Sequence, residues 1–230
     1  MKRLLLGLLF AVLTTPALAA GDAPPAPAAA PTAAQPSGTP PVRYDWQGNH
    51  RKAQAALAAR DYKTAIKLFT EILAYPRLPK SWLAPTYFFR GKAYRSSRQF
   101  DKAVEDYISA TKADPKLDAA FFELGATYQA MNQHAKAAAA FGEAIALKSD
   151  KADYFYGRCV SYSWLGNLTA AIRDCEAASR LRRNAETLAV LGRLYEDSGQ
   201  KQRAIESYRA ALAINPNEPT ALDGLKHLTK

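Results

Sequence analysis

The feature that most constrains this chain is an eight-residue pattern that recurs at a nearly constant spacing. It occupies residues 87–94, 121–128, 155–162 and 188–195, so successive copies are offset by 34, 34 and 33 residues. Each copy is followed by a small residue and, four positions later, by an aromatic residue or a cysteine. These pairs are Ala103 and Tyr107, Ala137 and Phe141, Ala171 and Cys175, and Ala204 and Tyr208. Such a period predicts similar stacked units rather than one compact core.

Within each period, apolar residues recur at helical spacing on both sides of a short turn, which predicts two amphipathic helices per unit. We expect units at about residues 46–79, 84–117, 118–151, 152–184 and 185–218. The first unit is divergent, because Asn49 and Ala56 stand where the opening aromatic residue and the Tyr are expected. Residues 219–230 carry Leu222, Leu225 and Leu228 at helical spacing, which predicts a final helix that caps the array.

The motif aromatic-x2-Leu-Gly-x2-Tyr, then Ala-x3-Phe, then Pro, at a period of 34 residues, resembles the tetratricopeptide repeat. Pro115 and Pro216 close two of the units, and the resemblance covers about residues 46–218. It implies an all-α, right-handed α-solenoid whose concave groove is lined by the first helix of each unit. It further implies a non-catalytic scaffold that binds a segment of a partner protein, as in envelope assembly, secretion or pilus biogenesis.

In that family, the residue after the opening aromatic faces the groove. Here the slot holds Phe88, Phe122 and Tyr156, which we expect to anchor a partner, since aromatic side chains dominate interfaces. The alternative is that this row packs inside the array. The side chains expected to flank the row are Lys92, Arg95, Gln129 and Arg193. The Lys and Asn set with which chaperone-binding relatives clamp a C-terminal carboxylate is not found in these slots.

Cys159 and Cys175 are the chain's two cysteines, and they occupy facing slots on the two helices of one unit. Antiparallel helices would bring these slots together, and an exported protein meets oxidising conditions. The pair is therefore a candidate disulfide. The alternative is two small buried thiols, which is how free cysteines usually pack.

The N-terminus has the organisation of an export signal. Lys2 and Arg3 precede an apolar run at residues 4–13, and the small residues Ala17 and Ala19 predict cleavage after Ala19. Cleavage would lower the net charge from +10 to +8, because it removes Lys2 and Arg3. Residues 20–45 are rich in Pro and Ala and predict a disordered linker. We therefore expect a periplasmic or secreted protein whose mature chain has no transmembrane span.

Signals for chemistry are missing from the sequence, so we expect no catalytic residues, no metal site and no cofactor. The histidines His50, His134 and His227 have no metal-ligand spacing, and no phosphate loop or nucleophile elbow occurs. No nucleic-acid-binding module is visible, so a nucleic-acid partner is not expected. An alternative function is a structural envelope protein that binds anionic lipid or cell-wall glycan through a basic convex face. The arginines that favour it are Arg173, Arg180, Arg182 and Arg183.

Overall fold

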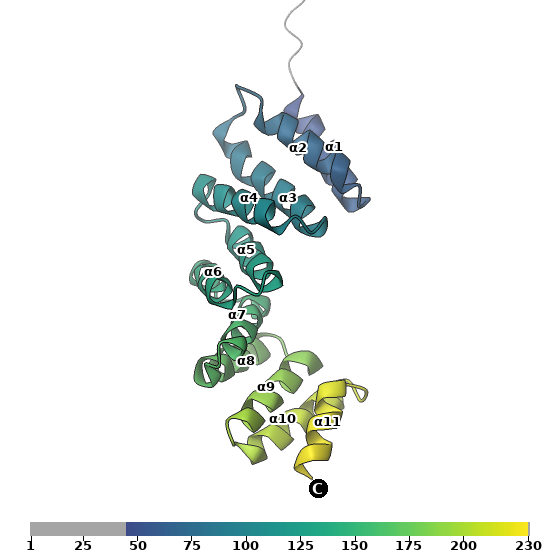
Figure 1. Ribbon diagram of the computed structural model, residues 1–230, viewed down its shortest axis with the longest axis vertical. Helices are drawn as coiled ribbons and strands as arrows, with labels where there is room; N and C mark the ends of the chain where they lie inside the picture. Colours follow the sequence, from purple (N-terminus) through teal and green to yellow (C-terminus); the bar gives the residue numbers. More distant parts are fainter. Residues whose placement is uncertain (1–44, 230) are drawn as a thin grey trace, which may run out of the picture. The chain divides into compact units, whose positions relative to one another are not determined.

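The computed structural model describes residues 45–229, and these residues form eleven α-helices and one 3-10 turn without a strand (Figure 1). The helices pair into five hairpins, which we call units 1 to 5, followed by a single last helix. The pairs are α1 (Trp46–Ala58) with α2 (Tyr62–Leu73), α3 (Leu83–Ser96) with α4 (Phe100–Ala113), α5 (Asp118–Ala130) with α6 (His134–Leu147), α7 (Ala152–Trp164) with α8 (Leu168–Leu181), and α9 (Ala185–Asp197) with α10 (Lys201–Ile214). Helix α11 (Pro219–Leu228) ends the described array, and a short 3-10 turn, η1 (Lys80–Trp82), precedes α3. The predicted all-helical solenoid of about five hairpins and a last helix is confirmed.

Every hairpin turns through one residue with a left-handed backbone. These residues are Arg60, Arg98, Asn132, Gly166 and Gly199, with φ between 57° and 75°. In unit 2 the Gln99 N–H then donates to the Tyr94 carbonyl at 2.8 Å, a bond that closes the end of α3. The same turn recurs in each unit because only a left-handed residue reverses the chain within so few positions.

A recurrent pair of a glycine and an aromatic ring holds the two helices of a unit together. A Cβ atom added to Gly125 on α5 would lie 2.9 Å from the Phe141 ring of α6, and Gly91 with Tyr107 and Gly192 with Tyr208 repeat this arrangement. The ring fills the space that the missing side chain leaves. This close approach explains why each of these glycines is followed, 16 positions later in the sequence, by an aromatic residue.

The same rings also join neighbouring units. Phe141 lies against Gly157 of α7 as well as Gly125, and Tyr208 lies against Gly224 of α11 as well as Gly192. Stacking therefore buries one ring between three helices, which is the obligatory burial expected of a repeat array.

Unit 1 is held by an aromatic cluster instead of a glycine and a ring. The buried His50 ring makes edge contacts with Phe69, Trp82 and Phe89 at centroid distances of 5.3, 5.0 and 5.6 Å, and Trp46 lies 4.6 Å from Trp82. Two of these rings come from η1 and α3, so the divergent first unit packs its own core against unit 2.

Helix α11 covers the end of unit 5. Leu225 and Leu228 pack against the cluster that includes Tyr208, whereas Leu222 is 48% exposed. Two of the three leucines predicted for the capping helix therefore pack against this cluster, and Leu222 lies outside it. No helix among residues 45–229 is long and apolar enough to cross a membrane. The predicted signal peptide and nearly all of the predicted linker lie outside the described residues.

Candidate functional site

Phe88 and Phe122, two of the three predicted groove aromatics, are half-buried rings that pack on other rings. Phe88 lies 6.1 Å from Tyr107 of α4, and Phe122 stacks 5.0 Å from Tyr154 of α7. Their neighbours one position earlier, Tyr87 and Phe121, are also half-buried rather than fully enclosed. Phe88 and Phe122 therefore help to join the helices, and their binding role stays a prediction.

Tyr156, the third predicted aromatic, differs because it borders an open cleft. Its hydroxyl donates a 2.7 Å hydrogen bond to Glu186 at the start of α9. Burial, together with this carboxylate, raises the pKa of the Tyr156 hydroxyl. The ring is thus a fixed, uncharged surface that connects units 4 and 5.

The cleft beside Tyr156 lies between α7 and α9 and has a volume of about 370 Å³. One wall comes from α7 and the other from α9, and the residues that line it are Tyr156, Val160, Ser163, Trp164, Val190, Arg193, Leu194 and Asp197. Trp164 is 71% exposed, and its ring stacks parallel on the His134 ring at a centroid distance of 5.3 Å. Since a large exposed aromatic beside a cleft is unusual on a soluble surface, this is the strongest candidate site.

Lys92 and Arg95, predicted to flank the aromatic row, are both engaged by one carboxylate. Arg95 Nη1 lies 2.7 Å from Glu123 Oε2 of α5, and Lys92 Nζ lies 3.9 Å from Glu123 Oε1. The two cations thereby hold α3 to α5, and their charge is partly neutralised within the array.

Gln129 is likewise engaged by its neighbours. Its side-chain amide donates to the Gly157 carbonyl at 2.8 Å and to the Ser161 hydroxyl at 2.9 Å, both on α7. The amide therefore fixes α5 against α7 at Gly157 and Ser161, which follow the cleft residues Tyr156 and Val160 in the sequence.

Arg193 remains available for an outside partner. It is exposed on α9, it lines the cleft with Trp164, and it has no ion pair among residues 45–229. It also borders a second hollow of about 550 Å³ between α9 and α11, which includes Asp223 and His227. Three of the four flanking residues predicted from the sequence are charged, and Arg193 is the one of these three that has no ion pair in the described part of the chain.

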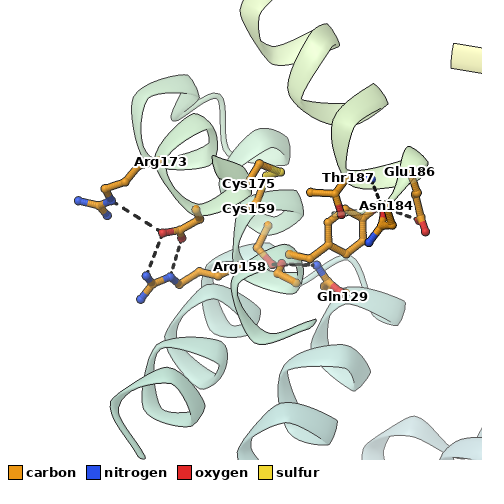
Figure 2. The surroundings of a disulfide bond; sticks show 12 residues. Gln129, Arg158, Cys159, Arg173, Cys175, Asn184, Glu186 and Thr187 are labelled. Carbon is orange, nitrogen blue, oxygen red and sulfur yellow. Dashed lines mark hydrogen bonds and ion pairs between the residues drawn. A yellow bond between two sulfur atoms is a disulfide. The ribbon is translucent and has the colours of Figure 1, made fainter. Parts of the chain in front are cut away.

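Cys159 and Cys175 lie between α7 and α8, fully buried, with their sulfurs bonded and their Cα atoms 5.4 Å apart (Figure 2). Cys159 takes the slot of Gly91, Gly125 and Gly192, and Cys175 takes the slot of the aromatic ring. The disulfide therefore fills, in unit 4, the space that a glycine and a ring fill elsewhere. Tyr156 and Val190 pack against the same cluster, so the bond supports the floor of the cleft.

The basic cluster of α8 is largely paired with acids. Arg173 lies 3.8 Å from Asp174, which also accepts two hydrogen bonds from Arg158 (Figure 2). Arg180 lies 4.0 Å from Glu176, and Arg182 contacts Asp153. Arg183 is exposed without an ion pair among the described residues. This pairing weakens the case for α8 as an anion-binding face.

Sequence reasoning found two of the eight lining residues, Tyr156 and Arg193, and missed the other six, which are Val160, Ser163, Trp164, Val190, Leu194 and Asp197. A usable signal existed, because Tyr156, Val160 and Trp164 follow one another at intervals of four residues and so share one face of α7. What the sequence could not show is that α9 stands far enough from α7 at this point to leave a cleft.

Comparison with known families matches three segments of the chain. Tetratricopeptide repeat models match residues 119–151 and 185–218, and a TPR repeat model matches residues 91–132. Human Tetratricopeptide repeat protein 6 is 28% identical over 172 residues, which is 73% of this chain and 32% of that protein. Hsp70-Hsp90 organizing protein 1 of Glycine max is 23% identical over 175 residues, or 76% of this chain and 28% of that protein. Photosystem I assembly protein Ycf3 of Synechococcus is 34% identical over 85 residues, or 35% of this chain and 49% of that protein.

Solved structures show the same fold. YrrB, described as a TPR protein with an unusual peptide-binding site, superposes with a TM-score of 0.69 at 18% identity, covering 79% of this chain and 92% of that one. MamA from Desulfovibrio magneticus gives a TM-score of 0.68 at 15% identity, covering 76% and 97%. The chain spans less than half of the length of the three relatives named above. The matched repeats and the stacked hairpins agree, and the chain is a tetratricopeptide repeat protein.

Proposed function

We propose that this protein is a non-catalytic scaffold that binds a segment of a partner protein in the cleft between α7 and α9. The relatives support a role in protein interaction, because their names describe an organising protein and an assembly protein, and YrrB is described by its peptide-binding site. A tetratricopeptide array offers a rigid face built from many helices, which suits recognition of an extended or helical segment.

The observation that carries this proposal is the exposed Trp164 beside a cleft of about 370 Å³. Val160 and Val190 give the cleft apolar walls, and Tyr156 gives it a fixed aromatic surface. The unpaired Arg193 adds a guanidinium fork that can hold a carboxylate in two-point contact. The arrangement fits an apolar or aromatic side chain of the partner with an acidic group close to it.

We also propose that the protein is exported and works in the cell envelope, in assembly, secretion or pilus biogenesis. The export pattern of residues 1–19 supports this location, and a buried disulfide between Cys159 and Cys175 is typical of oxidising compartments. The test is the N-terminal sequence of the protein recovered from its host. A mature chain that begins at Ala20 agrees with the proposal, and a cytoplasmic chain that begins at Met1 contradicts it.

The binding proposal is tested by selecting peptides from a displayed library on the wild-type protein and measuring each with variants. Trp164→Ala removes an exposed ring that contributes little to packing, and Arg193→Glu reverses the free charge. Leu165→Ala is the matched control, since Leu165 is a 49% exposed residue next to Trp164 that does not line the cleft.

Selected peptides should bind at least tenfold more weakly to Trp164→Ala and to Arg193→Glu, because a desolvated aromatic contact or a charged hydrogen bond each contributes about 1.5–3 kcal/mol. Binding to Leu165→Ala should match the wild type. Peptides that bind all three variants equally well would rule out the α7–α9 cleft as the recognition site.

A further inference from the structure

The positive charge of the chain is concentrated in units 1 and 2. Residues 45–117 contain 14 Lys or Arg and seven Asp or Glu, a net charge of +7. Residues 118–230 contain 14 Lys or Arg and 13 Asp or Glu, a net charge of +1. The two parts have equal numbers of cations, so the difference lies in how many acids accompany them.

Fewer cations form ion pairs in units 1 and 2 than in the rest of the described chain. Beyond unit 2, Lys148 pairs with Asp118, and Arg203 pairs with Glu176. In units 1 and 2, Arg90 pairs with Asp106, Lys67 pairs with Glu71, and Lys92 and Arg95 pair with Glu123 of unit 3. Most other cations of these two units are exposed and have no ion pair within residues 45–229, among them Arg51, Lys52, Arg60, Lys63, Arg98 and Lys112.

Two of these unpaired cations have a backbone conformation that is unfavourable for arginine. Arg60 and Arg98 are the left-handed turn residues of units 1 and 2, with φ of 62° and 63°. The equivalent positions in the last three units hold Asn132, Gly166 and Gly199, the residue types that adopt this conformation at least cost. An arginine at such a turn adds local backbone strain, and the side chains of Arg60 and Arg98 have no ion pair or hydrogen bond within residues 45–229.

The α1–α2 turn, which holds Arg60, and the α3–α4 turn, which holds Arg98, lie on the same side of units 1 and 2 and form one edge (Figure 1). Arg98 and Lys102 on this edge line a hollow of about 420 Å³, and its other lining residues are Gln99, Phe100, Asp101 and Met131. Strained backbone positions are commonly retained where the side chain is used. Arg60 and Arg98 give this edge a positive charge in spite of their strained backbone. We therefore take the edge to indicate an anionic partner.

We propose that units 1 and 2, which we call the basic end, dock on the phosphate-rich surface of an anionic lipid bilayer. The free cations are spread over α1, α2, α4 and two turns instead of converging on one cavity, so they match an extended anionic surface better than a single bound anion. This surface is separate from the α7–α9 cleft, so each can be disproved without the other.

The test is sedimentation of the protein from Ala20 onward with vesicles of phosphatidylcholine alone or mixed with phosphatidylglycerol. The ratio of the two affinities separates the contribution of charge from any apolar contribution to vesicle binding. Arg60→Gln with Arg98→Gln removes two cations from the basic end. Lys201→Gln with Arg209→Gln is the matched control, because it removes two exposed cations of α10 that have no ion pair in the described chain.

The wild type should prefer the anionic vesicles, and this preference should weaken as salt screens the charges. The Arg60 and Arg98 double variant should lose about 30-fold in the affinity ratio at low salt, while the control stays near the wild type. Equal losses in both double variants would show a mere effect of net charge and overturn the proposal. So would the absence of any preference for anionic vesicles, or tight binding to a polyglutamate peptide without binding to vesicles.

Discussion

Arg90 and Asp106 form a two-point ion pair across the two helices of unit 2, with Arg90 Nε 2.8 Å from Asp106 Oδ2 and Nη2 2.7 Å from Oδ1. The Asp106 side chain is 5% exposed and the Arg90 side chain 18% exposed. Arg158 and Asp174 repeat the pair in unit 4. Unit 3 places Leu124 and Ala140 at the same two positions, where both are buried. The same pair of positions in the repeat thus holds either a buried ion pair or two apolar side chains.

This alternation predicts opposite results for single and paired substitutions in unit 2. Asp106→Ala alone leaves the Arg90 guanidinium half-buried without its carboxylate, and it should lower the free energy of unfolding by about 3 kcal/mol. Arg90→Leu with Asp106→Ala copies unit 3, and it should return to within about 1 kcal/mol of the wild type. Urea unfolding followed by circular dichroism measures both variants. A double variant that is as unstable as Asp106→Ala would show that unit 2 needs the ion pair itself.

The disulfide of unit 4 makes a second prediction of the same kind. If Cys159 and Cys175 together replace a glycine and a ring, then Cys159→Gly with Cys175→Phe restores the arrangement of Gly125 and Phe141. Cys159→Ala with Cys175→Ala removes the bond and leaves a cavity, and it should lower the free energy of unfolding by about 3 kcal/mol. The Gly and Phe variant should recover a large part of this loss.

Thermal unfolding with and without a thiol reductant compares these proteins. Reductant should lower the melting temperature of the wild type once the bond is reduced, and it should leave both double variants unchanged. Alkylation under denaturing conditions without reductant supplies the independent check. Two alkylated thiols in the wild type would contradict the bond between Cys159 and Cys175.

A third prediction concerns pH and the buried His50. Burial lowers the pKa of the His50 imidazole, although a hydrogen bond to the Pro85 backbone opposes the shift. The folded protein therefore holds His50 neutral among Phe69, Trp82 and Phe89. Its stability contribution is fully present above the unfolded pKa of about 6.5, and is lost as the pH falls from there through the folded pKa.

The loss should reach at most about 1.4 kcal/mol per pH unit in that window. It is measured as the melting temperature of the wild type and of His50→Phe between about pH 7 and pH 5, where an ordinary histidine becomes charged. His50→Phe keeps a ring in the cluster and removes the titrating group, so its melting temperature should vary less with pH. Parallel curves for the two proteins would assign the pH dependence to other groups.

A fourth prediction follows from the left-handed turns of units 1 and 2. Arg98→Gly should raise the free energy of unfolding by up to about 1 kcal/mol, because glycine adopts a φ of 63° without a Cβ clash. Gly199→Arg in unit 5 should lower it by a similar amount, since φ there is 75°. Urea unfolding of the two variants measures the pair of effects. A destabilised Arg98→Gly would mean that the arginine side chain stabilises the fold through the turn.

The sequence predicted the hairpins because their signals are local and repeated. The contact between Gly125 and the Phe141 ring 16 residues later lies within one unit, so it repeats with the motif, although it was recognised only in the structure. The candidate site depended instead on contacts between units, which have no fixed spacing rule. Lys92 and Arg95 form ion pairs with Glu123, and Gln129 donates hydrogen bonds to α7. These contacts depend on side-chain geometry, which residue types alone do not determine. Trp164 was missed because its exposure follows from the distance between α7 and α9.

The most direct test of the proposed function uses Trp164 as its own reporter. Trp46→Phe with Trp82→Phe keeps rings in the unit 1 cluster and leaves Trp164 as the remaining tryptophan of the chain. A peptide selected on the wild-type protein is titrated into this variant while its emission is recorded, and calorimetry measures the affinity in parallel. We predict a saturable shift of the Trp164 emission with the calorimetric affinity. Calorimetric binding with an unchanged emission spectrum would contradict recognition at the α7–α9 cleft.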